Sequence, residues 1–286
     1  MYREAVTSKQ LATWLAAAQI PVAVQLAAGN AWWTVALGTA ACFLATLAVW
    51  KWGNLRGWLS IPAYLLLIIY VGQLFRESAE VWTGSSYPAV PLILLALALW
   101  SALKGAAAAA RVGCVLFWAV LLAYPTVLWE KVRDGIPSAN PQYINVSLYL
   151  LLLLPTMGKS LRKKEEGAVW KLSLPGILAI VGAILAGNTD FYEMVRGMDF
   201  MGTVQHFDAL ISATATLGWF ALLSYSLSLC GALGQGKGSV IMGALAMTGW
   251  MLCDMHISYP ILLILGSIFW VLLPLLTQGI EREKNL

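Results

Sequence analysis

The stretch from residue 59 to 82, LSIPAYLLLIIYVGQLFRESAEVW, decides the fold class because a long apolar run ends in a group of charges. Residues 59–73 carry no charge, and Arg76, Glu77 and Glu80 follow directly. A helix that crosses the hydrocarbon layer needs about 20 such residues. We therefore expect a membrane-spanning helix whose charged end reaches water or lipid headgroups. Arg76 and Glu80 are four residues apart, so they can pair on one helix face.

The rest of the chain has the same character. Of its 286 residues 60% are hydrophobic and 11% are charged, whereas soluble domains carry about 25% charged residues. Runs such as YLLLLLP do not alternate as the strands of a membrane barrel do. We expect an all-α integral membrane protein with one domain, 1–286, of about ten transmembrane helices. The predicted segments are 9–28, 31–51, 57–79, 88–104, 107–129, 143–158, 171–188, 206–230, 238–255 and 257–277.

Basic residues predict the orientation, because loops rich in Lys and Arg stay in the cytoplasm. With ten spans and both termini cytoplasmic, 14 basic residues fall on the inner side and 4 on the outer side. The outer four are Arg76, Lys131, Arg133 and Arg196. The inner ones are Arg3, Lys9, Lys51, Arg56, Lys104, Arg111, Lys159, Arg162, Lys163, Lys164, Lys171, Lys237, Arg282 and Lys284.

Neither metal chemistry nor catalysis is indicated. The four cysteines stand singly, which is typical of small buried apolar side chains, so we expect no metal and no disulfide. His206 and His256 both fall at outer ends of spans, where each can be a hydrated interfacial side chain or the two can clamp a haem. Acidic residues gather at outer edges and in outer loops rather than at membrane depth. We therefore expect no enzyme, no catalytic residues and no cofactor.

Binding or transport of a small solute inside the bundle is the remaining chemistry. Transporters place such sites near the midplane, where a broken helix leaves backbone groups free. In the first segment Pro21 removes a backbone donor and stands between Gln19 and Gln25. An ordinary proline kink is the alternative. The other candidate ligand-binding residues are Tyr70, Gln73, Asn145, Tyr149 and Thr214.

Four stretches, taken in order, resemble the spore-germination permease family, the integral membrane B subunits of nutrient germinant receptors. The first, 7–38, opens with Thr7 and Gln10 in the spacing of a capping box. LFRESAEVW, 74–82, is similar to the end of the family's third span. Residues 87–118 resemble its fourth and fifth spans, with a lysine-glycine turn between them, and residues 194–220 resemble the approach to its eighth span.

This resemblance implies a fold of the amino acid, polyamine and organocation transporter superfamily. Its two five-helix inverted repeats would cover about 9–130 and 143–277, with the first helix of each repeat broken around the ligand. It also implies residence in the inner membrane of a spore, a small amino acid-like ligand, and a complex with a larger A subunit and a C-subunit lipoprotein. No nucleic-acid partner is expected.

The sixth segment departs from the family pattern. It is short, and no glutamate follows its proline, while the first segment lacks the family's glycines. Two other functions therefore stay open: an amino acid secondary transporter of the vegetative cell membrane, and a structural subunit that does not sense a nutrient. The charge cluster of Arg76, Glu77 and Glu80 is expected to be an interfacial anchor, with a gate or a subunit contact as the alternative.

Overall fold

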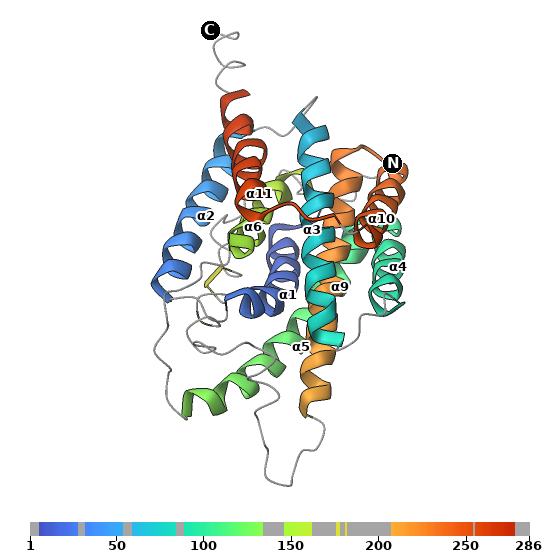
Figure 1. Ribbon diagram of the computed structural model, residues 1–286. Coiled ribbons are helices and arrows are strands. Elements are labelled where there is room, and N and C mark those ends of the chain that lie inside the picture. Colours follow the sequence, from blue (N-terminus) through green and yellow to red (C-terminus); the bar gives the residue numbers. More distant parts are fainter. Residues whose placement is uncertain are drawn as a thin grey trace.

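The chain forms a bundle of helices in a computed structural model (Figure 1). The described residues are 6–27, 32–53, 59–83, 89–133, 146–161, 176–177, 181, 207–253 and 255–277. Within this part of the chain the structure contains no strand. The prediction of an all-α protein is therefore confirmed.

The helices follow the predicted apolar segments closely. The exception is 171–188, of which only residues 176–177 and 181 are described. Hydrophobic runs of membrane length thus mark where helices lie, because each run has to form its backbone hydrogen bonds within itself. The bounds are α1 Ser8–Ala27, α2 Trp32–Trp52, α3 Ser60–Thr83, α4 Ala89–Leu103, α5 Ala106–Arg133, α6 Val146–Leu153, the 3₁₀ helix η2 Leu154–Ser160, α9 Phe207–Leu233, α10 Lys237–Leu252, α11 Tyr259–Gly266 and the π-helical turn η4 Ser267–Leu272.

Local sequence signals explain where α1 begins and where α4 ends. The Thr7 hydroxyl accepts the Gln10 N–H (3.3 Å), and the Gln10 side chain accepts the Thr7 N–H (3.2 Å). The predicted capping box is confirmed, and it satisfies two backbone donors at the start of α1. After α4, Gly105 has a φ of 110° and donates its N–H to the Ala102 carbonyl. Glycine suits this left-handed position because it has no Cβ to clash.

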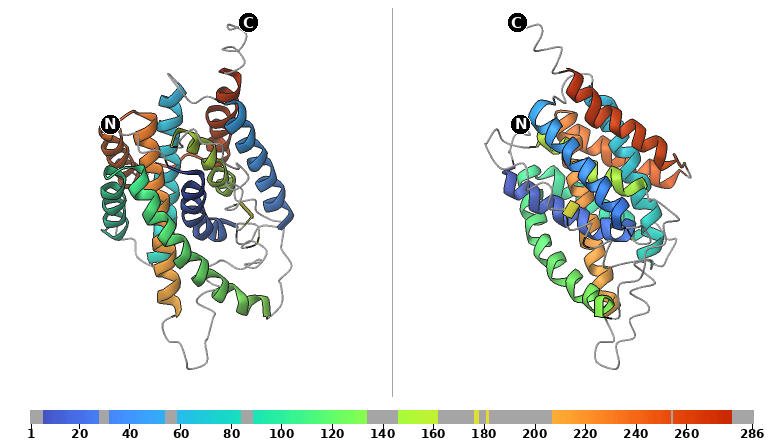
Figure 2. Two further views of the ribbon diagram at one scale, coloured as in Figure 1. Left: turned by 180° about the vertical axis from the view of Figure 1, so that it is seen from behind. Right: turned by 90° about the vertical axis from the view of Figure 1, so that its left-hand side faces the viewer.

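The first helix is the centre of the core. α1 packs mainly against α5 and α9, and its side chains from residue 14 to 23 are buried. Trp14 donates to the Ala221 carbonyl (3.2 Å), and its ring meets that of Tyr225 edge to face at 5.3 Å. Figure 2 shows α1 crossing the bundle, with α4 and α10 on one side and α2 and α11 on the other. A helix enclosed on all sides can place a polar side chain deep inside the protein.

Three described helices are long and apolar enough to cross a membrane: Trp33–Trp52, Ala213–Leu233 and Tyr259–Thr277. The outward faces of several helices also carry large apolar side chains. Examples are Leu37, Leu44, Ile61, Ile93, Leu97, Trp118, Leu122, Leu245 and Ile264. The described part of the chain is therefore all-helical, and its long apolar helices and exposed apolar side chains are consistent with an all-α membrane protein.

Several lysines lie at helix ends. Lys51 is in the last turn of α2, Lys104 directly follows α4, and Lys237 begins α10. Lys159, at the end of η2, donates to the Gly53 carbonyl just after α2 (2.5 Å). Figure 1 shows α4 and α10 on the right of the bundle and α2 on the left. That these basic residues lie on a common side of a membrane stays a prediction.

Candidate binding site at a broken helix

The sixth segment breaks in the middle of the core. α6 ends at Leu153, and the chain continues as the 3₁₀ helix η2 with Pro155 in its first turn. Pro155 has no N–H, so the Leu151 carbonyl, four residues earlier, lacks its usual helical donor. The side-chain amide of Gln19, in α1, donates to that carbonyl at 2.5 Å. A proline in one helix thus creates the acceptor for a buried side chain of another.

Three more helices hold the broken segment by the same kind of contact. Each donates a side-chain hydrogen bond from an aromatic ring to a backbone carbonyl of α6 or η2. These bonds join Tyr70 Oη to Ser147 O (2.8 Å), Tyr225 Oη to Leu154 O (3.2 Å) and Trp50 Nε1 to Pro155 O (2.9 Å). The Tyr225 and Trp50 bonds reach η2 just past the break, and the Tyr70 bond reaches the first turn of α6, so the three bonds fasten both halves of the broken segment to neighbouring helices.

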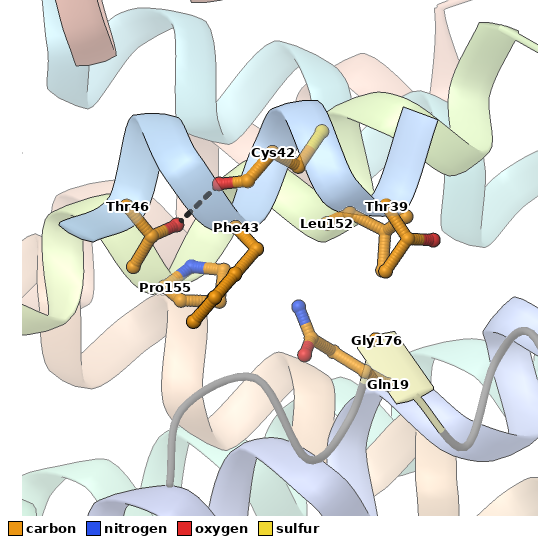
Figure 3. A pocket seen from close by; sticks show the side chains of 8 residues that line it. All are labelled: Gln19, Thr39, Cys42, Phe43, Thr46, Leu152, Pro155 and Gly176. Atoms are coloured by element: carbon orange, nitrogen blue, oxygen red, sulfur yellow. Dashed lines mark hydrogen bonds between the residues drawn. The ribbon is translucent and has the colours of Figure 1, made fainter. Parts of the chain in front are cut away.

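A small cavity lies beside this break, between α1, α2 and η2 (Figure 3). Its volume is about 20 Å³, room for about one water molecule. Figure 3 shows the Gln19 amide below the helix that carries Thr39 and Thr46. The lining residues are Gln19, Thr39, Cys42, Phe43, Thr46, Leu152, Pro155 and Gly176.

Two buried oxygens at the cavity have no hydrogen-bond partner among the described residues. They are Gln19 Oε1 and Thr39 Oγ1, on side chains that are 1% and 7% exposed. A buried polar atom left without a partner costs about 1–3 kcal/mol. A molecule that donates hydrogen bonds to these oxygens would recover that free energy, so the cavity is the best candidate for a binding site.

The structure brings together three of the predicted ligand-binding residues at α6. Gln19 and Tyr70 both donate to its carbonyls, and Tyr149 extends from it to donate to the Thr34 carbonyl (3.0 Å). Of these three, only Gln19 lines the cavity. Pro21 packs against Gly218 of α9, where an added Cβ would overlap the proline ring. The polar groups of the two tyrosines are thus already engaged between helices.

Other predicted residues lie elsewhere. Thr214 is buried in α9 and does not line the cavity. Gln73 is 1% exposed and pairs with Ile257, donating to its carbonyl (2.9 Å) and accepting its N–H (3.0 Å). Asn145 and the side chain of Gln25 lie outside the described residues. The predicted cluster is therefore divided between the break and the end of α3.

The charged end of α3 holds the connection between α10 and α11. Arg76 donates to the Cys253 carbonyl (3.3 Å). Glu77 accepts from Tyr259 Oη (2.5 Å) and contacts His256 Nδ1 (3.0 Å). His256 Nδ1 also lies 3.0 Å from Gln73 Nε2, so this ring nitrogen contacts both an amide donor and a carboxylate. The cluster is thus more than an interfacial anchor, because it fastens α3 to a distant segment.

Two predictions about this region are not tested. The Glu80 side chain lies outside the described part, so its pairing with Arg76 remains a prediction. His206 lies outside it as well, so a shared haem with His256 cannot be placed. Over the described ranges no group of three or more His, Cys, Asp or Glu side chains is arranged to hold a metal ion.

The sequence reasoning missed the contribution of α2 to the cavity. Thr39, Cys42, Phe43 and Thr46 recur at positions i, i+3, i+4 and i+7, the spacing of one helix face. This short polar and small-residue face was a usable signal inside an otherwise apolar helix. The spacing identifies this face of α2 but not the residues that pack against it, because its contact with Gln19 depends on the tertiary fold.

Over the described residues the fold is all-helical, with three helices long and apolar enough to cross a membrane, a broken helix in the core and a small cavity beside the break. A scan against protein-family models and searches of curated proteins and solved structures find no match for this chain.

Proposed function

We propose that this chain is a permease-like membrane subunit that binds a small amino acid-like solute at the break of its sixth helix. The observation that carries the proposal is the buried side chain of Gln19. Gln19 lines the cavity, its nitrogen holds the broken helix through Leu151, and its oxygen has no partner among the described residues. A solute that binds the Gln19 side chain would therefore act directly on the contact that holds the break.

The resemblance to spore-germination permeases gives the biological setting of this proposal. The subunit would lie in the inner spore membrane with ten spans in two five-helix repeats and both termini in the cytoplasm. It would act as a germinant-receptor subunit beside an A subunit and a C-subunit lipoprotein. The agreement of the described helices with the predicted segments supports this architecture.

A structural subunit that senses no nutrient is the second candidate, and the size of the cavity favours it. About 20 Å³ accommodates one small group, so a whole amino acid would require the helices around the break to separate. Tyr70 and Tyr149 also use their hydroxyls to hold neighbouring helices together. A vegetative amino acid transporter would share the same fold, and radiolabelled uptake into vesicles would identify it.

Thermal unfolding of the full chain in lipid nanodiscs tests the proposal. Individual amino acids are titrated, and we expect at least one to raise the Tm saturably. Gln19→Met keeps the side-chain length and removes both polar atoms, so it should abolish that rise. Thr248→Val is the matched control, because its hydroxyl bonds only to the Ala244 carbonyl of its own helix. No saturable rise with any amino acid would reject solute binding and favour the structural subunit.

A further inference from the structure

One face of α3 carries a row of polar side chains that bond to two other parts of the fold. Tyr70, Gln73 and Glu77 stand at positions i, i+3 and i+7 of this face. Tyr70 donates to the first turn of α6. Gln73 and Glu77 instead contact the connection between α10 and α11, which crosses α3 in Figure 1. The same helix face thus holds both α6 and this connection.

His256, in this connection, has one ring nitrogen between two groups with opposite requirements. Its Nδ1 is 3.0 Å from the amide nitrogen of Gln73, which only donates, and 3.0 Å from Oε1 of Glu77, which as a carboxylate oxygen only accepts. Without a proton Nδ1 can bond only to the amide, and with a proton it can bond only to the carboxylate. The protonation of His256 therefore selects its partner.

The protonated ring makes the stronger contact with Glu77. An imidazolium adds the attraction of an ion pair to the hydrogen bond, whereas the neutral ring has no net charge and in one of its tautomers bonds to Gln73 instead. The side chain of His256 is 58% exposed and that of Glu77 is 40% exposed. Water can therefore supply the proton, and it also keeps the energy of the ion pair modest.

The surrounding groups leave this pair as the titrating element over the described residues. Tyr259, the one ionisable side chain of α11, donates its hydroxyl to the second oxygen of Glu77 (2.5 Å) and so fixes the carboxylate beside the ring. Arg76 donates to the Cys253 carbonyl (3.3 Å), at the start of the connection, and the Cys253 thiol is exposed. Residues 239–252 of α10 carry no ionisable side chain.

We infer that Glu77 and His256 form a proton-operated latch that ties the connection between α10 and α11 to α3. Imidazole changes its charge between about pH 5 and 8, where glutamate is ordinarily ionised. The latch therefore closes as the pH falls through this range and loosens as it rises. The two bonds of Gln73 to Ile257 do not depend on the ring, so they keep the loosened connection in place.

The latch goes beyond the proposed function, because it requires no solute. It acts next to the broken helix, since α11 follows the connection and packs against α6. Trp270, in the π-helical turn after α11, meets the ring of Tyr70 edge to face at 6.3 Å. A proton that closes the latch would thus restrain a helix that borders the break.

Hydrogen exchange of the full chain in nanodiscs, at about pH 5.5 and about pH 8, tests the latch. Each rate is divided by the intrinsic exchange rate at the same pH. The Ile257 N–H is a direct reporter, because it donates to Gln73 Oε1 (3.0 Å) beside the ring. We expect residues 255–258 to be about two- to fivefold better protected at the lower pH, the effect of an exposed ion pair. Residues 239–252 should show no such change.

Two variants should each abolish this difference. His256→Gln removes the titrating ring, and Glu77→Gln removes the charge with which the ring pairs. His206→Gln is the matched control, because it removes the other histidine of the chain. Asp254→Asn and Glu80→Gln remove acidic side chains that lie outside the described residues. All three controls should keep the difference between the two pH values.

Equal protection of residues 255–258 at both pH values in the unaltered chain would overturn the latch. A difference that persists without His256 or without Glu77, or one that any control abolishes, would overturn it as well. Either of the two variants decides alone, so one that fails to fold, seen as lost protection of α9, leaves the test intact. If the latch fails, the proposed solute binding stands, and if no amino acid raises the Tm, the latch stands.

Discussion

Gln19 donates its side-chain amide to the backbone carbonyl of Leu151, across the interface of α1 and α6. This carbonyl is available because Pro155 supplies no N–H four residues later. Gln19 and Leu151, which are far apart in the chain, are thus hydrogen-bonded because Pro155 leaves the Leu151 carbonyl without its helical donor. The same Gln19 side chain lines the cavity beside the break.

Pro155→Ala should uncouple Gln19 from the break. The new N–H at 155 competes for the Leu151 carbonyl and lets α6 continue, so the Gln19 nitrogen loses its partner. In a double-mutant cycle of Pro155→Ala with Gln19→Met we expect a coupling of about 0.5–1.5 kcal/mol in the free energy of unfolding. Denaturant titration in mixed micelles measures it, and strictly additive effects would contradict the link.

Gly38→Ala should destabilise the fold by about 1–3 kcal/mol, because the added Cβ would overlap the Tyr149 ring. The close approach of α2 to α6 depends on this glycine. Gly249→Ala is the matched control: it lies in α10 with open space around the added Cβ, so a small stabilisation of up to about 1 kcal/mol is expected. A lower Tm for Gly38→Ala with an unchanged or higher Tm for the control is the predicted pattern. Equal changes in both would show that α2 and α6 are not packed this closely.

Gln73→Leu should release the connection between α10 and α11. It leaves the N–H and the carbonyl of Ile257 without their side-chain partner, at a cost of about 1–3 kcal/mol. Hydrogen exchange of residues 253–258 should become faster. Tyr259→Phe removes the hydroxyl that bonds to Glu77 and Gln73 but leaves both Gln73 bonds to Ile257, so its effect on exchange should be smaller. Unchanged exchange in Gln73→Leu would mean that the connection is held by other contacts.

Cysteine labelling tests the proposed orientation. Cys253 is exposed in the connection after α10, and the proposed topology places it on the outer side, whereas it places Lys104, directly after α4, on the inner side. In sealed right-side-out vesicles an impermeant maleimide should label Cys253. In a Cys253→Ser background Lys104→Cys should react only after the membrane is permeabilised. Labelling of Lys104→Cys in intact vesicles would reverse the proposed topology.

Helix positions could be predicted from the sequence because an apolar run of membrane length can form all of its backbone hydrogen bonds within itself only as a helix. The capping box of Thr7 and Gln10 was visible for a similar reason, since both residues act within one turn. The contacts of Gln73 and Glu77 were not visible, because their partners lie about 180 residues away. Gln19 was recognised as a buried polar side chain in the first span, but its partner depended on how Pro155 breaks a different helix.

A density map of the full chain in nanodiscs, determined with a saturating concentration of the amino acid that raises the Tm most, tests the central claim most directly. The account predicts density for the amino acid in the cavity beside the break, in contact with the Gln19 side chain, with Gln19 still bonded to Leu151. Density for the amino acid elsewhere, or a cavity that contains only water under these conditions, would contradict it.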